Sequence, residues 1–280
     1  MRSFLEKSSD HHSQVLSVDR LLHQGRTAFQ DVLIFENRLF GRVLVLDGVI
    51  QLTEWDNHIY HEMIAHVPLM AHGLAKRVLV IGGGDGGTLK EVLKHPVEEV
   101  VLIEIDREVI ELSQRFLPGV SAGAFSDPRS TVIVGDGTEY IADTDSQFDV
   151  IIIDSTDPVG PGEQLFSEAF YRHCRTRLLP GGIVAVQSGA GFHQPELLAK
   201  VCDRLGGVFG TAKPFLAPVP TYAAGALALV VAGSSGKALR APRKILKERF
   251  RPLEGRTRYY RPEVHRAAFT MVPVFGHGHT

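Results

Sequence analysis

The chain lacks most features that would mark it as a secreted, membrane or metal-binding protein. Its 280 residues include only two cysteines, Cys174 and Cys202, too few for a disulfide framework or a zinc cluster. The longest apolar run, residues 226–232, is too short to cross a bilayer, and the first residues lack the apolar core of a secretion leader. We therefore expect a cytoplasmic protein that makes no membrane contact.

An excess of charge of one sign is also missing. The chain has 30 Lys and Arg against 32 Asp and Glu, so its net charge is -2 and favours no nucleic-acid partner. Thirteen histidines are present, but none stands in a zinc-ligand spacing, and we expect no metal ion. The hydrophobic share of 44% is that of a globular domain with a sizeable core.

The first fifth of the chain has the character of a β-rich unit. Residues 1–13 are polar and are expected to be only partly ordered, whereas residues 14–53 carry β-like runs and the hairpin turn Asp47-Gly48. Residues 56–71 predict a helix with one apolar stripe. We expect a β-rich domain over 1–53 and a second domain over 54–280. Gln30 is either a surface amide or points into a shared cleft, and composition alone favours the surface.

A glycine-rich turn organises the second domain. Residues 78–89 read VLVIGGGDGGTL, which predicts a buried strand, a turn and a helix, and Gly82, Gly84 and Gly87 fit the G-x-G-x-x-G spacing of nucleotide-binding turns. Such turns attract anions, yet Asp85 puts a carboxylate there. A cationic ligand is therefore favoured; the alternative is that Asp85 only caps the helix.

From residue 76 to 232 strands and helices alternate, which predicts an α/β fold with a doubly wound, mostly parallel, Rossmann-like sheet. An acid stands at or just after the end of successive strands. These acids are Asp85, Glu104, Asp136, Asp154 and Asp157. Ligands bind at this edge of open α/β sheets, and so many carboxylates favour an organic polycation such as a polyamine. Glu104 and Asp106 both suit a ribose, and their spacing does not choose between them.

Several motifs together resemble the spermidine synthase family of polyamine aminopropyltransferases over residues 22–269. The motifs are VLDG at 45–48, YHEM at 60–63, GGGDGG at 82–87, DSTDP at 154–158, PTY at 220–222 and RYY at 258–260. The resemblance implies a methyltransferase-type fold, a homodimer, and aminopropyl transfer from decarboxylated S-adenosylmethionine to putrescine. It implies no cofactor beyond that co-substrate.

The resemblance also implies roles for particular residues. The nucleoside and thioether would be held by Gln30, Glu104, Asp136, Gly137 and Pro161. The aminopropyl group and the diamine would be lined by Tyr60, His61, Asp85, Asp154, Asp157, Gln187 and Tyr222. Asp154 would accept the proton, under a loop over residues 154–165. From the residues alone, Tyr60 is expected in the core and His61 in solvent.

Two other functions stay open from the sequence. An S-adenosylmethionine methyltransferase shares this fold and the acid that binds ribose. A polyamine or nucleoside sensor would keep the binding acids without needing Asp154, Asp157 and the loop that covers them.

Overall fold

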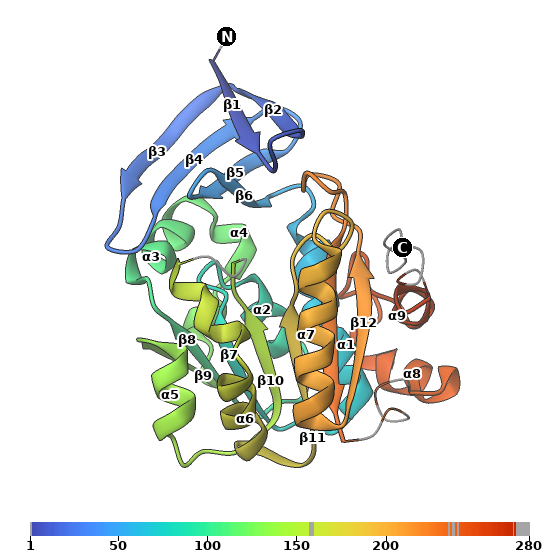
Figure 1. The fold of residues 1–280 in the computed structure, drawn as a ribbon. Coiled ribbons are helices and arrows are strands. Elements are labelled where there is room, and N and C mark those ends of the chain that lie inside the picture. Colours follow the sequence, from blue (N-terminus) through green and yellow to red (C-terminus); the bar gives the residue numbers. More distant parts are fainter. Residues whose placement is uncertain are drawn as a thin grey trace.

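The computed structural model describes residues 2–156, 160–234, 236, 239, 241–270 and 272, with only the backbone at residues 160 and 161. Its strands form a two-stranded, a four-stranded and a seven-stranded sheet (Figure 1). The two small sheets come first in the chain. Their strands are β1 (Arg2–Lys7), β2 (Ser13–Val18), β3 (Arg20–Arg26), β4 (Asp31–Asn37), β5 (Gly41–Leu46) and β6 (Val49–Thr53).

The first strand corrects the expectation of a partly ordered N-terminus. β1 pairs with β2 along its whole length, from Arg2 opposite Val18 to Lys7 opposite Ser13. The ring of Phe4 packs on Phe35 of β4 with centroids 5.6 Å apart. The order of this polar segment thus comes from pairing and from the partly buried ring of Phe4, which local sequence does not reveal.

Both faces of the four-stranded sheet are covered, because its side chains alternate between two apolar clusters. Phe35, Val43 and Val45 lie with Leu16 of the hairpin on one face. Val32, Ile34 and Leu44 lie on the other face, where they pack against apolar side chains of residues 109–120. The N-terminal sheet is therefore packed directly onto the rest of the molecule.

The large sheet has the strand order β12-β13-β11-β10-β7-β8-β9. Its strands are β7 (Arg77–Gly82), β8 (Glu99–Glu104), β9 (Ser130–Val134), β10 (Phe148–Asp154), β11 (Leu178–Gln187), β12 (Thr211–Ala217) and β13 (Leu227–Gly233). β13 runs antiparallel to both of its neighbours, and the remaining pairs are parallel. The predicted doubly wound α/β fold is confirmed.

Helices cover both faces of this sheet (Figure 1). They are α1 (Asn57–His72), α2 (Gly87–Leu93), α3 (Arg107–Phe116), α4 (Pro118–Ser121), α5 (Gly137–Asp143), α6 (Glu168–Thr176), α7 (Pro195–Phe209), α8 (Arg243–Phe250) and α9 (Pro262–Ala268). The 3-10 turns of the described residues include η1 (Ala124–Ser126), η2 (Gly160–Phe166) and η4 (Arg251–Leu253). Among the described residues, no helix has the length and hydropathy that crossing a bilayer requires.

From the sequence alone, residues 165–178 predict one helix that is closed by residues 180–182, but in the structure this stretch is divided in two. η2 ends at Phe166, and α6 begins after Ser167, whose hydroxyl accepts the N–H of Phe170 at 3.2 Å. Residues 180–182, expected to end that helix, instead lie inside β11, where the register against β10 shifts. The capping serine explains the break, since it satisfies one of the free N–H groups of a new helix start.

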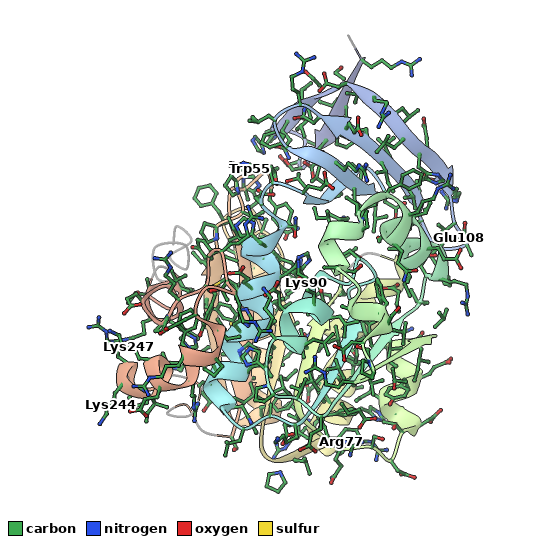
Figure 2. The ribbon with its side chains drawn as sticks, turned by 180° about the vertical axis from the view of Figure 1, so that it is seen from behind. Trp55, Arg77, Lys90, Glu108, Lys244 and Lys247 are labelled. Carbon is green, nitrogen blue, oxygen red and sulfur yellow. The ribbon has the colours of Figure 1, made fainter. Side chains whose placement is uncertain are left out.

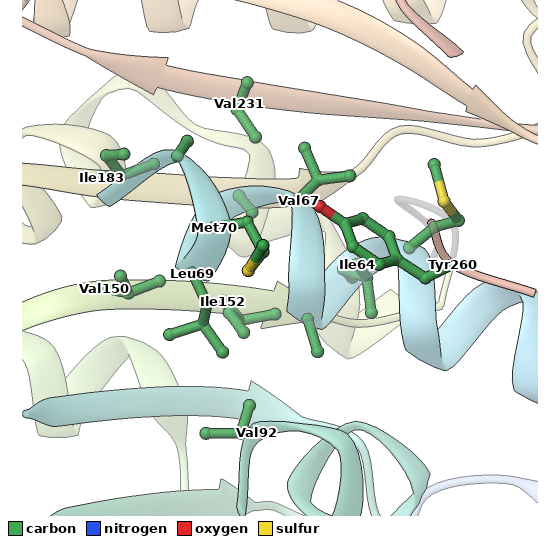
Figure 3. Close-up of a cluster of buried hydrophobic side chains, with 14 of the residues drawn as sticks. Ile64, Val67, Leu69, Met70, Val92, Val150, Ile152, Ile183, Val231 and Tyr260 are labelled. Atoms are coloured by element: carbon green, nitrogen blue, oxygen red, sulfur yellow. The ribbon is translucent and has the colours of Figure 1, made fainter. Parts of the chain in front are cut away.

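α1 is buried on almost all sides: the predicted apolar stripe lies in the core, and polar residues such as His61 and Glu62 are buried as well. Ile64, Val67, Leu69 and Met70 face different neighbours, and each is at most 2% exposed. Figure 3 shows these side chains among strand residues such as Ile152, with Tyr260 beside Ile64 and Val67. A helix with such an enclosed position is a core element rather than a surface helix.

Glu62 of α1 fixes the C-terminal segment to this core. Its carboxylate is 1% exposed and accepts the backbone N–H groups of Arg258, Tyr259 and Tyr260 at 2.7–2.8 Å. One buried acid thus accepts hydrogen bonds from three consecutive backbone N–H groups that lie outside helices and strands.

Glu62→Gln should destabilise the fold by about 1–3 kcal/mol, because the amide keeps one acceptor and turns an NH2 group toward N–H donors. Urea unfolding measures the change in free energy. Glu111→Gln, on the exposed face of α3, is the control. Equal stability of the two variants would contradict the anchoring role.

Candidate active site

The carboxyl ends of β7, β8 and β10 meet at one edge of the large sheet, on the side of the N-terminal sheet (Figure 1). The glycine loop after β7 lies between two acids. A Cβ atom on Gly83 would stand 2.9 Å from the carboxylate of Asp154, and one on Gly84 would stand 2.9 Å from that of Glu104. Gly82 has φ 83°, and a Cβ there would meet the backbone oxygen of Asp154 at 2.1 Å. Only glycine allows this close approach.

Asp154, the last residue of β10, is 9% exposed. Its Oδ1 accepts the hydroxyl of Tyr60, and its Oδ2 accepts the hydroxyl of Thr88 at 2.6 Å. Burial, and then the negative charge of Asp85, raise the pKa of Asp154 above its usual range. The carboxylate is therefore held in a fixed orientation and takes up a proton more readily than an exposed aspartate. Tyr60 is buried as expected, but it has a polar role there.

Asp85 lies in the glycine loop and pairs with His61. Its Oδ1 accepts the N–H of Gly87 at 2.6 Å and lies 3.2 Å from Nε2 of His61. Burial opposes both charges, but the mutual attraction prevails, raising the pKa of His61 and lowering that of Asp85. Asp85 thus bonds the first N–H of α2 and also faces an ionisable partner. The expectation of a solvated His61 is wrong, since it is 1% exposed.

Glu104 and Asp106, which the sequence left equivalent, have different surroundings. Glu104 is 8% exposed beside the glycine loop, and burial raises its pKa to about 7. Asp106 accepts the N–H of Glu108 at the start of α3, and also the Gln30 amide at 2.9 Å and the Thr27 hydroxyl at 2.6 Å. Glu104 is therefore the acid that faces the loop. Gln30 is half-buried against Asp106 rather than a surface amide.

The other predicted residues surround the same edge. Asp136 accepts the N–H of Thr138 at the start of α5, and Gly137 allows Ile81 to approach its backbone. Gln187 is buried at the end of β11. Asp157 lies outside the described residues, and Pro161 is described only by its backbone in η2.

Tyr222 lies near the acids of the site. Its hydroxyl donates to the carbonyl of Gln51 at 2.6 Å. Its pKa is raised by burial and then by the charges of Asp56, Asp154 and Asp85, so it shares their acidic surroundings. The structure thus brings Tyr60, His61, Asp85, Asp154 and Tyr222 to one site.

Sequence reasoning missed the residues that hold this site in shape. Asp56 is 1% exposed and accepts the backbone N–H and the hydroxyl of Thr221 at 2.9 and 2.8 Å, which fixes the turn before Tyr222. Gln14 of the hairpin donates to the Thr221 carbonyl at 2.9 Å and to the buried Glu6. These pairs are 165 and 207 residues apart in the chain, so no local pattern announces them.

Fold and site together define a doubly wound α/β protein with a glycine-rich turn and acids at one edge of its large sheet. Two family models match the chain: a spermidine synthase tetramerisation domain over residues 3–54 and a spermine/spermidine synthase domain over residues 57–240. The chain is 47% identical to polyamine aminopropyltransferase 1 of Pseudomonas aeruginosa over 97% of its own length and 95% of that relative. It is 46% identical to the polyamine aminopropyltransferase of a Ruegeria species, over 95% and 94%.

Solved structures agree. A spermidine synthase in complex with the transition-state analogue AdoDATO matches with a TM-score of 0.90 and 37% identity, over 96% of this chain and 91% of that one. The spermidine synthase of Thermotoga maritima matches with a TM-score of 0.87 and 35% identity, over 96% and 90%. The chain belongs to the spermidine synthase family and is a polyamine aminopropyltransferase. This membership removes the methyltransferase and sensor alternatives.

The buried Glu104 should make the free protein less stable as pH rises from about 4.5 to 7. In this range the folded state holds a proton that the unfolded state has released, so raising the pH favours unfolding, by about 3 kcal/mol in total. Glu104→Gln, which has no such proton, should flatten this slope. Urea unfolding at several pH values compares the two proteins; parallel slopes would show that Glu104 ionises normally.

Proposed function

We propose that the chain transfers the aminopropyl group of decarboxylated S-adenosylmethionine to putrescine, giving spermidine, 5'-methylthioadenosine and a proton. The observation that carries this proposal is the pair of acids beside Tyr60: the buried Asp154 at the end of β10 and the partly buried Asp85 in the glycine loop after β7. Repulsion between them is relieved best by a cationic substrate. The complex of a related spermidine synthase with AdoDATO supports the same reaction.

The nucleoside end would lie at β8 and β9. Glu104 beside the glycine loop suits the ribose hydroxyls, and Asp136 with Gly137 suits the adenine at the start of α5. Gln30, held by Asp106, and Pro161 would complete this part. A ribose bonded to Glu104 favours the ionised carboxylate, so binding would lower the pKa that burial has raised.

The cationic groups would lie at β7, β10 and β11. Asp85 would take the ammonium of the aminopropyl arm, while the diamine would lie among Tyr60, His61, Asp157, Gln187 and Tyr222. The acceptor nitrogen attacks the carbon next to the sulfonium as the carbon–sulfur bond breaks, and sulfur keeps the electron pair as a neutral thioether. Asp154 takes the proton of the attacking amine, for which its raised pKa is suited. Alignment of nitrogen, carbon and sulfur provides further acceleration.

The proposal also covers the oligomeric state of the protein and its location in the cell. The apolar, edge-bearing N-terminal sheet supports self-association. The match of residues 3–54 to a model described as a tetramerisation domain supports an oligomer, of which the predicted homodimer is the smallest form. A cytoplasmic location and the lack of a further cofactor stay predictions, the first supported by the two free cysteines.

Incubation with putrescine and decarboxylated S-adenosylmethionine should release methylthioadenosine and spermidine. Asp154→Asn should lower turnover by about 10²–10⁴, the contribution of a general base, and leave the affinity for methylthioadenosine unchanged. Chromatography of the products measures both proteins. Wild-type turnover in the variant would assign the proton to another group, and absence of both products with the wild-type chain would refute the reaction.

Asp85→Asn should separate charged from uncharged ligands. The variant should bind decarboxylated S-adenosylmethionine more weakly, since a close charge pair near a protein surface is worth up to about 4 kcal/mol. Methylthioadenosine has no charged arm and should keep its affinity. Calorimetric titration compares the variant with Asp145→Asn, which neutralises a fully exposed acid. Equal losses for both ligands would show that Asp85 only shapes the turn.

A further inference from the structure

A cavity of about 220 Å³ is lined by none of the acids assigned to the active site. It is bounded by α1, α2, α4 and the segment that follows η4. Four of its lining residues are cations: Lys90, Lys94, Arg256 and Arg258. Figure 2 shows Lys90 between the ribbons of α1 and α4, on the side opposite to that of Figure 1.

The acids of this cavity already have their bonds. Both oxygens of Glu62 accept backbone N–H groups, as described above. Oε2 of Glu91 lies 3.1 Å from Nε2 of His66 and 2.6 Å from Nζ of Lys94. At the edge, Oε2 of Glu54 accepts the N–H of Arg42 at 2.9 Å. The acceptors here are therefore largely used within the protein.

The donors, by contrast, are in surplus. Nζ of Lys90 is 3.7 Å from the nearest oxygen of Glu91, beyond hydrogen-bond length, although the side chain is only 23% exposed. Within the described residues the Arg258 guanidinium donates no hydrogen bond, and Nδ1 of His58 is buried without a bonding partner. Arg256 bonds only backbone carbonyls. A cavity with spare cationic donors and occupied acids is complementary to an anion.

The size of the cavity limits the anion. Pockets for drug-sized ligands measure roughly 300–1,000 Å³, and this one is smaller. Lysine and arginine together suit a tetrahedral oxyanion, which offers several strong acceptors in a small volume. We propose that this cavity binds a small tetrahedral oxyanion, either free phosphate or the phosphate of a small monoester.

Such an anion would act on the active site through α2. Lys90 lies on the helix that begins at the glycine loop, and its charge favours the ionised form of Asp85 while it repels a cationic ligand nearby. An anion on Lys90 would offset that repulsion. This consequence rests on the proposed function: at constant ionic strength, phosphate should lower the KM for the cationic co-substrate about twofold to fivefold, the size of a screened surface charge interaction.

Direct binding tests the site without any turnover. Inorganic phosphate is titrated calorimetrically into wild type, Arg258→Gln, Lys90→Gln and the control Lys244→Gln, which changes an exposed lysine of α8 (Figure 2), with chloride keeping the ionic strength equal. We expect saturable binding to wild type and control, at least tenfold weaker in the other two. Arg258→Gln removes no bond within the described residues, so this variant should stay folded. It therefore still tests the site if Lys90→Gln is unstable.

Two results would overturn the proposal: no saturable phosphate binding to wild type, or equal affinity in all four proteins. A parallel titration with glycerol phosphate distinguishes the sources of the anion. Binding of the monoester as tightly as free phosphate supports a phosphorylated metabolite, and binding of free phosphate alone supports the inorganic ion. If phosphate binds but the aminopropyl transfer assay fails, the site stands and the proposed function does not.

Discussion

Repulsion between Asp85 and Asp154 is the constraint that the rest of the site accommodates. The buried carboxylate of Asp154 and the partly buried carboxylate of Asp85 destabilise each other, and the negative charge of each is stabilised locally in a different way. Asp85 gains an imidazole partner and a backbone N–H, whereas Asp154 gains two hydroxyl donors and a raised pKa. One acid is thereby kept charged and the other is prepared to take up a proton. This difference arises because Asp154 is the last residue of β10, whereas Asp85 lies in the loop between β7 and α2.

The scaffold around this pair joins parts of the chain that are distant in sequence. Asp106 ties the start of α3 to Gln30, and Asp56 ties the start of α1 to Thr221. Each of these acids satisfies several donors at once, so removing one would leave buried polar groups without partners. The N-terminal sheet is therefore part of the site's construction as well as a neighbour of the large sheet, and the cluster that contains Val32 and Leu117 supports its position.

Sequence predicted the large sheet well, because buried parallel strands such as residues 78–81 are uniformly apolar and glycine turns have a distinctive spacing. It placed Asp85, Glu104 and Asp154 at one edge for the same reason. Prediction from the sequence failed where contacts between distant parts of the chain decide the structure. The polar β1 is ordered by pairing, the polar as well as the apolar residues of α1 are buried because the helix is enclosed, and His61 is paired with an acid 24 positions away. Asp56 and Thr221 carry no local pattern, so only the folded chain reveals their partnership.

The link from Gln14 to Thr221 has a consequence for how the chain is made and handled. During synthesis the turn that carries Tyr222 appears more than two hundred residues after the hairpin strand that supports it. The wall formed by Tyr222 is therefore completed only when most of the polypeptide has been made. For the same reason, an affinity tag fused before β1 would extend the strand that carries Glu6, whose contacts with Gln14 and Ile50 help to shape that wall, so the position of a tag is a structural choice for this protein.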